Sequence, residues 1–217
     1  MRRWCSPNPL FDFVQTRCME RSLQARCRSS VCESDSGWIV GPELAAVQSI
    51  YGGKVLLDAD FDLASVTAEL ASREPSILHI ASHGVFTGDP ATSFLLAYDE
   101  KINMNQLSEI VGTTRFRDQP LELLVLSACE TAAGDERSAL GLAGVAIKAG
   151  ARSALGSLWT IGDEATQILI EEFYTQLKDP SISKARALQL AQVKLLENPK
   201  FEHPRNWSPY LIISNWL

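Results

Sequence analysis

Three short and nearly continuous apolar runs, at residues 77–81, 121–127 and 152–158, stand out in the hydrophobic pattern of this chain. A strand covered on both faces, as in a parallel sheet, is apolar at almost every position. Apolar residues elsewhere recur at helical spacing, most clearly at 163–177 and 184–196. Strands that alternate with helices predict an α/β fold with a mainly parallel sheet covered on both faces.

Capping residues predict where several shorter elements begin and end. A helix is expected from Pro42 to the pair Gly52-Gly53, because proline suits a first helical position and glycine a C-cap. Asp62 is the expected N-cap of a helix at 63–72. The remaining expected elements are strands at 55–57, 94–98 and 210–213, a helix at 106–111 capped by Asn105, and a helix at 139–148 capped by Ser138.

Size and charge limit the classes of function. The 217 residues have room for one α/β domain with a well-buried core. The net charge is −6, and no basic patch interleaved with aromatic residues occurs, so nucleic acid is not an expected partner. No apolar run approaches the roughly 18 to 20 residues that span a bilayer. We therefore expect a soluble protein without a membrane partner, and the single cysteine of the globular part fits a reducing compartment such as the cytoplasm.

The first 36 residues differ from the rest in composition. They are rich in arginine and show no sustained apolar period, which is typical of a disordered extension, although an arginine-rich leader also suits a transit peptide. Four of the five cysteines lie here, in a spacing that matches no zinc finger. The chain therefore divides into an extension at 1–36, expected to be disordered, and a globular domain at 37–217.

Cys129 and His83 are the candidate catalytic residues. Each directly follows an expected core strand, and the carboxyl ends of parallel strands are where such sheets carry their working sites. The histidine lies 46 residues upstream of the cysteine (129 − 83), close to the spacing of about 50 in one class of cysteine peptidases. A lone cysteine is more often a small buried hydrophobe, so the pairing with His83 carries the hypothesis. We expect His79 to be a buried core histidine and His203 a surface residue.

This pair suggests nucleophilic catalysis. His83 would take the proton of the thiol, and the thiolate would attack a carbonyl carbon. The backbone N–H groups of Gly84 and Cys129 would hold the developing oxyanion. No residue spacing suggests a metal site, a dinucleotide fingerprint or a P-loop, so no metal or cofactor is expected.

Six blocks in order resemble the CHAT domain, the caspase-like domain often found downstream of tetratricopeptide repeats. The resemblance covers about residues 41–217. The blocks are Ile80-Ala-Ser-His-Gly84, Leu124-Val-Leu-Ser-Ala-Cys-Glu-Thr131, Gly141-Leu-Ala-Gly144, Ala149-Gly-Ala-Arg152, Ser157-Leu-Trp159 and Trp207-Ser-Pro-Tyr-Leu-Ile-Ile213.

The resemblance implies a caspase-like three-layer sandwich with His83 and Cys129 as the dyad of a cysteine peptidase. Similarity to separase implies that Asp163 lines the pocket for a basic substrate residue, although Asp163 also suits the N-cap of the following helix. The substrate would be a protein or peptide. The alternative is a non-cleaving signalling module regulated by a tetratricopeptide-repeat partner.

Two departures from the family stand out. Its members begin with another buried strand, and the only candidate here is the short Gly37-Trp-Ile-Val40, so the first strand of the sheet is expected to be weak or incomplete. No 34-residue period occurs either, so the chain resembles a domain separated from its repeats.

Overall fold

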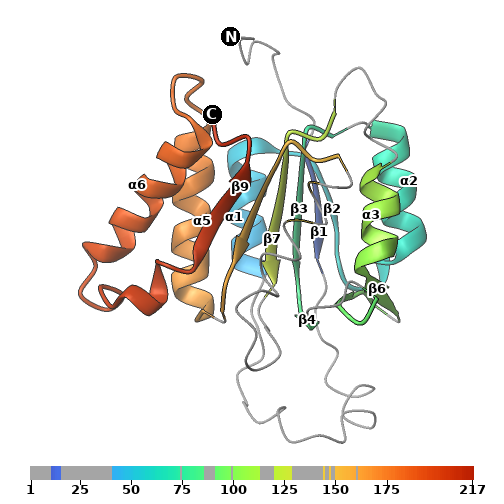
Figure 1. Cartoon of the computed structure of the whole chain (residues 1–217), viewed down its shortest axis with the longest axis horizontal. Helices are drawn as coiled ribbons and strands as arrows, with labels where there is room; N and C mark the ends of the chain where they lie inside the picture. The colour runs from blue at the N-terminus through green and yellow to red at the C-terminus, as the bar shows by residue number, and fades with distance from the viewer. Residues whose placement is uncertain are drawn as a thin grey trace, which may run out of the picture.

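The protein is a three-layer α/β sandwich with a sheet between two layers of helices (Figure 1). The computed structural model describes residues 11–15, 41–73, 75–85, 91–98, 100–112, 120–128, 144, 147, 150–159 and 161–217. The α/β class with a mainly parallel central sheet is the predicted one. The expected helix at 139–148 lies almost entirely outside the described residues.

The central sheet has six strands in the order β2-β1-β3-β7-β8-β9. All neighbours pair in parallel except β8 and β9, which pair antiparallel. The strands are β1 (Phe11–Gln15), β2 (Lys54–Leu56), β3 (Ile77–Ser82), β7 (Leu123–Ala128), β8 (Ser153–Ser157) and β9 (Tyr210–Ser214). The central pair, β3 and β7, is in continuous register from Ile77↔Leu123 to Ser82↔Ala128.

Strand β1 corrects the prediction for the N-terminal extension. We expected residues 1–36 to be disordered, but Phe11–Gln15 lies between β2 and β3 and pairs in parallel with both. This strand therefore satisfies backbone hydrogen-bonding groups on both of its neighbours. The additional strand that we expected to be weak or incomplete is thus supplied by the N-terminal extension. Residues 37–40, the segment predicted to form it, lie outside the described residues.

Two hydrophobic cores fill the space between the sheet and the two helical layers. Leu78 and Ile80 of β3 point to the face covered by α2 (Leu63–Arg73) and α3 (Met104–Gly112). Ile77 and Ala81 point to the opposite face, as the two-residue period of a strand requires. That face is covered by α1 (Gly41–Tyr51), α5 (Asp163–Leu177) and α6 (Lys184–Leu196).

The caps explain where the helices begin and end. Gly52 and Gly53 follow α1 with φ of 74° and 105°, a region that glycine enters without strain. Asp62 Oδ1 accepts from Ser65 N at 2.7 Å and caps α2 as predicted. The expected cap Asn105 is wrong, because Asn103 caps α3. Asn103 Oδ1 accepts from Gln106 N and Gln106 Oε1 accepts from Asn103 N, both at 2.9 Å, which is a reciprocal capping box.

A small antiparallel sheet lies directly after β3. Its strands are β4 (Gly84–Val85), β5 (Phe94–Leu96) and β6 (Lys101–Asn103), in that order. Only one residue, His83, separates β3 from β4. The chain therefore turns from the central sheet into the small sheet at the candidate histidine.

Candidate functional site

The carboxyl ends of β3 and β7 lie side by side and define the candidate site. Ser82 and Ala128, the last residues of the two strands, are register partners. His83 comes next after Ser82 and belongs to the described residues. Cys129 comes next after Ala128 and lies outside them. The two candidate catalytic residues thus follow paired positions on neighbouring parallel strands.

The backbone of His83 is held by the small sheet. Leu96 N donates to His83 O at 2.8 Å. The buried hydroxyl of Ser82 contacts Leu96 O at 2.5 Å and His83 O at 3.0 Å. The side chain of His83 is half-buried. These contacts fix the point at which the imidazole leaves the end of β3.

The backbone N–H of Gly84, one of the two expected oxyanion donors, is not directed at the neighbouring strand β5. Gly84 is the register partner of Leu95, and the flanking hydrogen bond runs from Leu96 N to His83 O. In an antiparallel ladder this pattern makes Gly84 and Leu95 a non-hydrogen-bonded pair, so the N–H of Gly84 points away from β5. The second expected oxyanion donor, Cys129 N, lies outside the described residues.

Asp163 is the first residue of α5, and it is half-buried. The N-cap is Gly162, so the prediction that Asp163 itself is the cap residue is wrong. The negative charge of Asp163 is nevertheless favourable at this position, because the N-terminus of a helix carries a partial positive charge. Because β8 runs parallel to β7 and leads through residues 158–162 to α5, Asp163 lies towards the same edge of the sheet as His83.

An exposed tryptophan lies on this connection. Trp159 follows β8, is 39 % exposed, and its Nε1 donates to Arg205 O at 3.0 Å. Among the described residues, no group of three or more His, Cys, Asp or Glu side chains lies together so that it could hold a metal ion.

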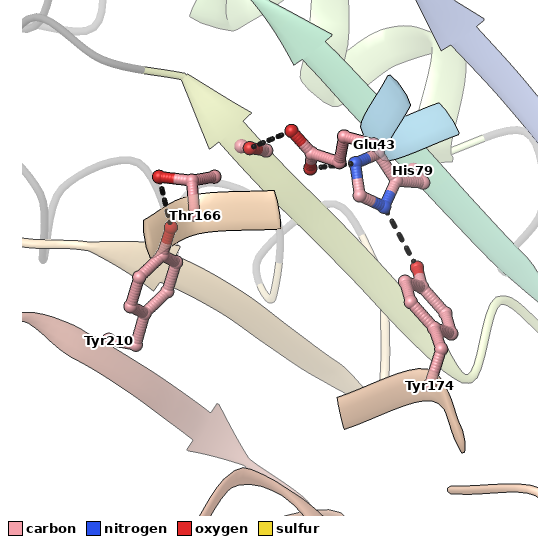
Figure 2. Close-up of polar contacts among 6 residues, drawn as sticks. Glu43, His79, Thr166, Tyr174 and Tyr210 are labelled. Atoms are coloured by element: carbon pink, nitrogen blue, oxygen red, sulfur yellow. Dashed lines mark hydrogen bonds and ion pairs between the residues drawn. The ribbon is translucent and has the colours of Figure 1, made fainter. Parts of the chain in front are cut away.

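A buried polar cluster lies on the α1 and α5 side of β3 (Figure 2). His79 Nε2 is 3.1 Å from Glu43 Oε1 of α1, and His79 Nδ1 is 3.0 Å from the hydroxyl of Tyr174 on α5. Ser127 Oγ of β7 donates to the other carboxylate oxygen of Glu43 at 3.2 Å. The prediction that His79 is a core histidine is confirmed, and His203 is exposed as predicted.

The hydroxyl of Tyr174 keeps its proton at neutral pH. Burial, and then the charges of Glu43 and Tyr51, raise the pKa of Tyr174 well above its ordinary value of 10.0. The ring is fixed by edge contacts with Tyr51 and Phe173, at centroid distances of 5.6 and 5.4 Å. The protonated hydroxyl can donate to His79 Nδ1 or accept from an Nδ1–H, so the tautomer of His79 sets the direction of this hydrogen bond.

Sequence reasoning missed Glu43, Ser127 and Tyr174 as members of this cluster. A signal for Glu43 was available, because it precedes Val47 by four residues and so shares the apolar face of α1. Glu43 and Val47 are both buried. Nothing in the chain order indicated that Tyr174, 95 residues from His79 along the sequence, would reach it.

Comparison with known proteins identifies the family. The model of the CHAT domain matches residues 38–215, whereas the comparison with curated proteins gives no match. In the part of the chain that the structure describes, no helix is both long and apolar enough to cross a bilayer. The family match covers most of the chain and agrees with the three-layer fold. The chain therefore belongs to the CHAT domain family, a caspase-like family.

Proposed function

We propose that the chain is a cysteine peptidase domain in which Cys129 is the nucleophile and His83 is its base. The observation that carries the proposal is the register pair Ser82↔Ala128, because His83 and Cys129 are the next residue on each strand. Neighbouring strands lie about 4.8 Å apart and consecutive Cα atoms about 3.8 Å apart. Covalent geometry therefore keeps the distance between the two Cα atoms below about 12 Å, and the side chains meet when both residues stay close to the register pair.

The reaction follows from these groups. His83 accepts the proton of the Cys129 thiol, and the thiolate attacks the carbonyl carbon of the scissile bond. The N–H of Gly84, which is directed away from β5, donates to the oxyanion together with the N–H of Cys129. His83 then protonates the departing amine, leaving a thioester on Cys129. Water, deprotonated by His83, hydrolyses the thioester and regenerates the thiol.

Asp163 would select a basic residue on the acyl side of the scissile bond. It lies towards the edge of the sheet where the strands end, and its carboxylate is complementary to a guanidinium or ammonium group. The preceding Ile161 is buried, which fixes the chain just before the helix. The substrate would then be a protein or peptide cut after arginine or lysine.

Covalent labelling tests the dyad. The cysteines at 5, 18, 27 and 32 are replaced by serine so that Cys129 is the only thiol, and the protein is treated with a peptidyl-arginine acyloxymethyl ketone. Mass spectrometry should find the adduct on Cys129. Because a positioned general base contributes about 10²–10⁴-fold, His83→Ala should slow labelling at least about 100-fold.

The matched control is His203→Ala, which removes an exposed histidine and should leave the labelling rate unchanged. Equal labelling of wild type and His83→Ala would contradict the dyad and favour a non-cleaving interaction module.

A further inference from the structure

The buried cluster of Glu43, His79, Ser127 and Tyr174, referred to below as the Glu43 cluster, takes no part in the reaction described above. Its four residues are 4, 0, 2 and 0 % exposed. They come from α1, β3, β7 and α5, so one polar cluster joins the two central strands to two helices of the same layer. Figure 2 shows the ring of His79 between Glu43 and Tyr174.

Stability alone gives a poor reason for such a cluster. Taking a carboxylate out of water costs several kcal/mol, and apolar side chains of the same volume in place of a buried ionic group are often as stable or more so. The strand residues beside the cluster on this face, Ile77, Ala81 and Val125, are apolar. A polar group in this environment therefore calls for a directional role that apolar packing does not provide.

The positions of the residues along the strands indicate that role. Ser127 lies two residues before Cys129 on β7, and His79 lies four residues before His83 on β3. The carboxylate of Glu43 contacts both, Ser127 through Oε2 and His79 through Oε1. One side chain from α1 thus bridges the two strands that lead to the candidate dyad.

The cluster acts at a distance from the reacting atoms. At about 3.3 Å per residue, His79 lies about 10 Å before Ser82, the last residue of β3, and Ser127 lies about 3 Å before Ala128, the last residue of β7. Its influence has to pass through the backbone of the two strands. Side chains that bridge neighbouring strands reduce the sliding and twisting of one strand relative to the other. Such motion would misplace the dyad, and a misplacement of a catalytic group by 1 Å costs up to about 100-fold in rate.

We propose that Glu43 and Ser127 are positioning residues that hold the carboxyl ends of β3 and β7 together so that His83 faces Cys129. This inference rests on the proposed function. Tyr174 completes the arrangement from α5, because its hydroxyl orients the ring of His79 through Nδ1 while Nε2 faces Glu43.

The test compares two buried serines on the neighbouring strands β7 and β8. Ser127 and Ser153 are both buried in core strands, and each hydroxyl donates one hydrogen bond, to Glu43 and to Glu122 O respectively. Ser127 lies at the carboxyl end of β7, whereas Ser153 begins β8 at the opposite edge. Ser153→Ala therefore shows what the loss of one buried hydroxyl donor does when the donor lies far from the candidate dyad.

Labelling of Cys129 by the arginine probe should separate the two variants. We expect Ser127→Ala to slow labelling at neutral pH at least about 10-fold, within the range that a small misplacement produces. Its rate profile should shift to higher pH, towards the ordinary thiol pKa of about 8.5. Ser153→Ala should keep the wild-type rate and profile. Identical rates and profiles in the two variants would overturn the proposal.

Amide hydrogen exchange provides a readout that does not depend on the dyad. Ser127→Ala should speed exchange at residues 80–83 and 126–128, and Ser153→Ala should not. If wild-type labelling does not depend on His83, the proposed function fails, and exchange still decides whether Glu43 and Ser127 hold the strand ends. Equal exchange at these residues in both variants would then overturn the inference as well.

Discussion

Removal of residues 1–15 should abolish cooperative folding, because it removes β1 from its place between β2 and β3. Five residues of β1 pair with β3, and three of them also pair with β2. With about one hydrogen bond per register pair and about 1 kcal/mol net for each, these pairs amount to about 8 kcal/mol.

A rearrangement of the remaining strands would recover only part of the free energy of these hydrogen bonds. If β2 moved by one strand position and paired directly with β3, its three residues would regain about 3 kcal/mol. The truncated chain therefore loses at least about 5 kcal/mol, which is comparable with the total stability of about 5–15 kcal/mol of an ordinary domain.

Urea unfolding followed by far-UV circular dichroism and tryptophan fluorescence measures this loss. The matched control lacks only residues 1–8, which retains all of β1 and should preserve the midpoint and slope of the transition. The chain without residues 1–15 should show a shallow transition, or one that begins without added urea. A cooperative transition within about 1 kcal/mol of the full chain would show that β1 does not belong between β2 and β3.

Two further predictions concern the pocket and the buried tyrosine. Asp163→Ala should reduce cleavage after arginine about 10- to 100-fold, which corresponds to a charge-assisted hydrogen bond of about 1.5–3 kcal/mol. Alkylation of Cys129 by iodoacetamide should stay unchanged, as should both rates in Glu164→Ala; equal loss of both rates in Asp163→Ala would point to a structural role. Because burial raises the pKa of Tyr174 in the folded state, its stabilisation is complete below the ordinary pKa of about 10 and is lost as the pH rises. The stability advantage of wild type over Tyr174→Phe should shrink by about 1.4 kcal/mol between about pH 9 and 11 in urea titrations, whereas parallel pH curves would mean that Tyr174 ionises equally in both states.

Much of the sandwich could be predicted from the sequence, because its main elements have strong local signals. The helices at 163–177 and 184–196 have the predicted bounds, since apolar residues recur at helical spacing along both segments. The buried strands before His83 and Cys129 were also predicted, because residues covered on both faces are apolar throughout. The candidate site follows from these strand ends.

The remaining features depend on contacts between distant parts of the chain. Phe11–Gln15 is a five-residue segment that contains Asp12 and lies in an arginine-rich region, so no local period distinguishes it as a central strand. The direction of β9 depends on its pairing with β8, which an apolar run does not specify. The capping box of Asn103 and Gln106 had a usable signal in their three-residue spacing.

The structure of the protein after reaction with a peptidyl-arginine ketone tests the central claim most directly. The account predicts a covalent bond from Cys129 Sγ to the inhibitor, with a ring nitrogen of His83 within hydrogen-bonding reach of the reacting centre, about 2.6–3.2 Å. The arginine side chain should face the carboxylate of Asp163. An adduct on Cys129 with the ring of His83 directed away from the inhibitor would contradict the dyad.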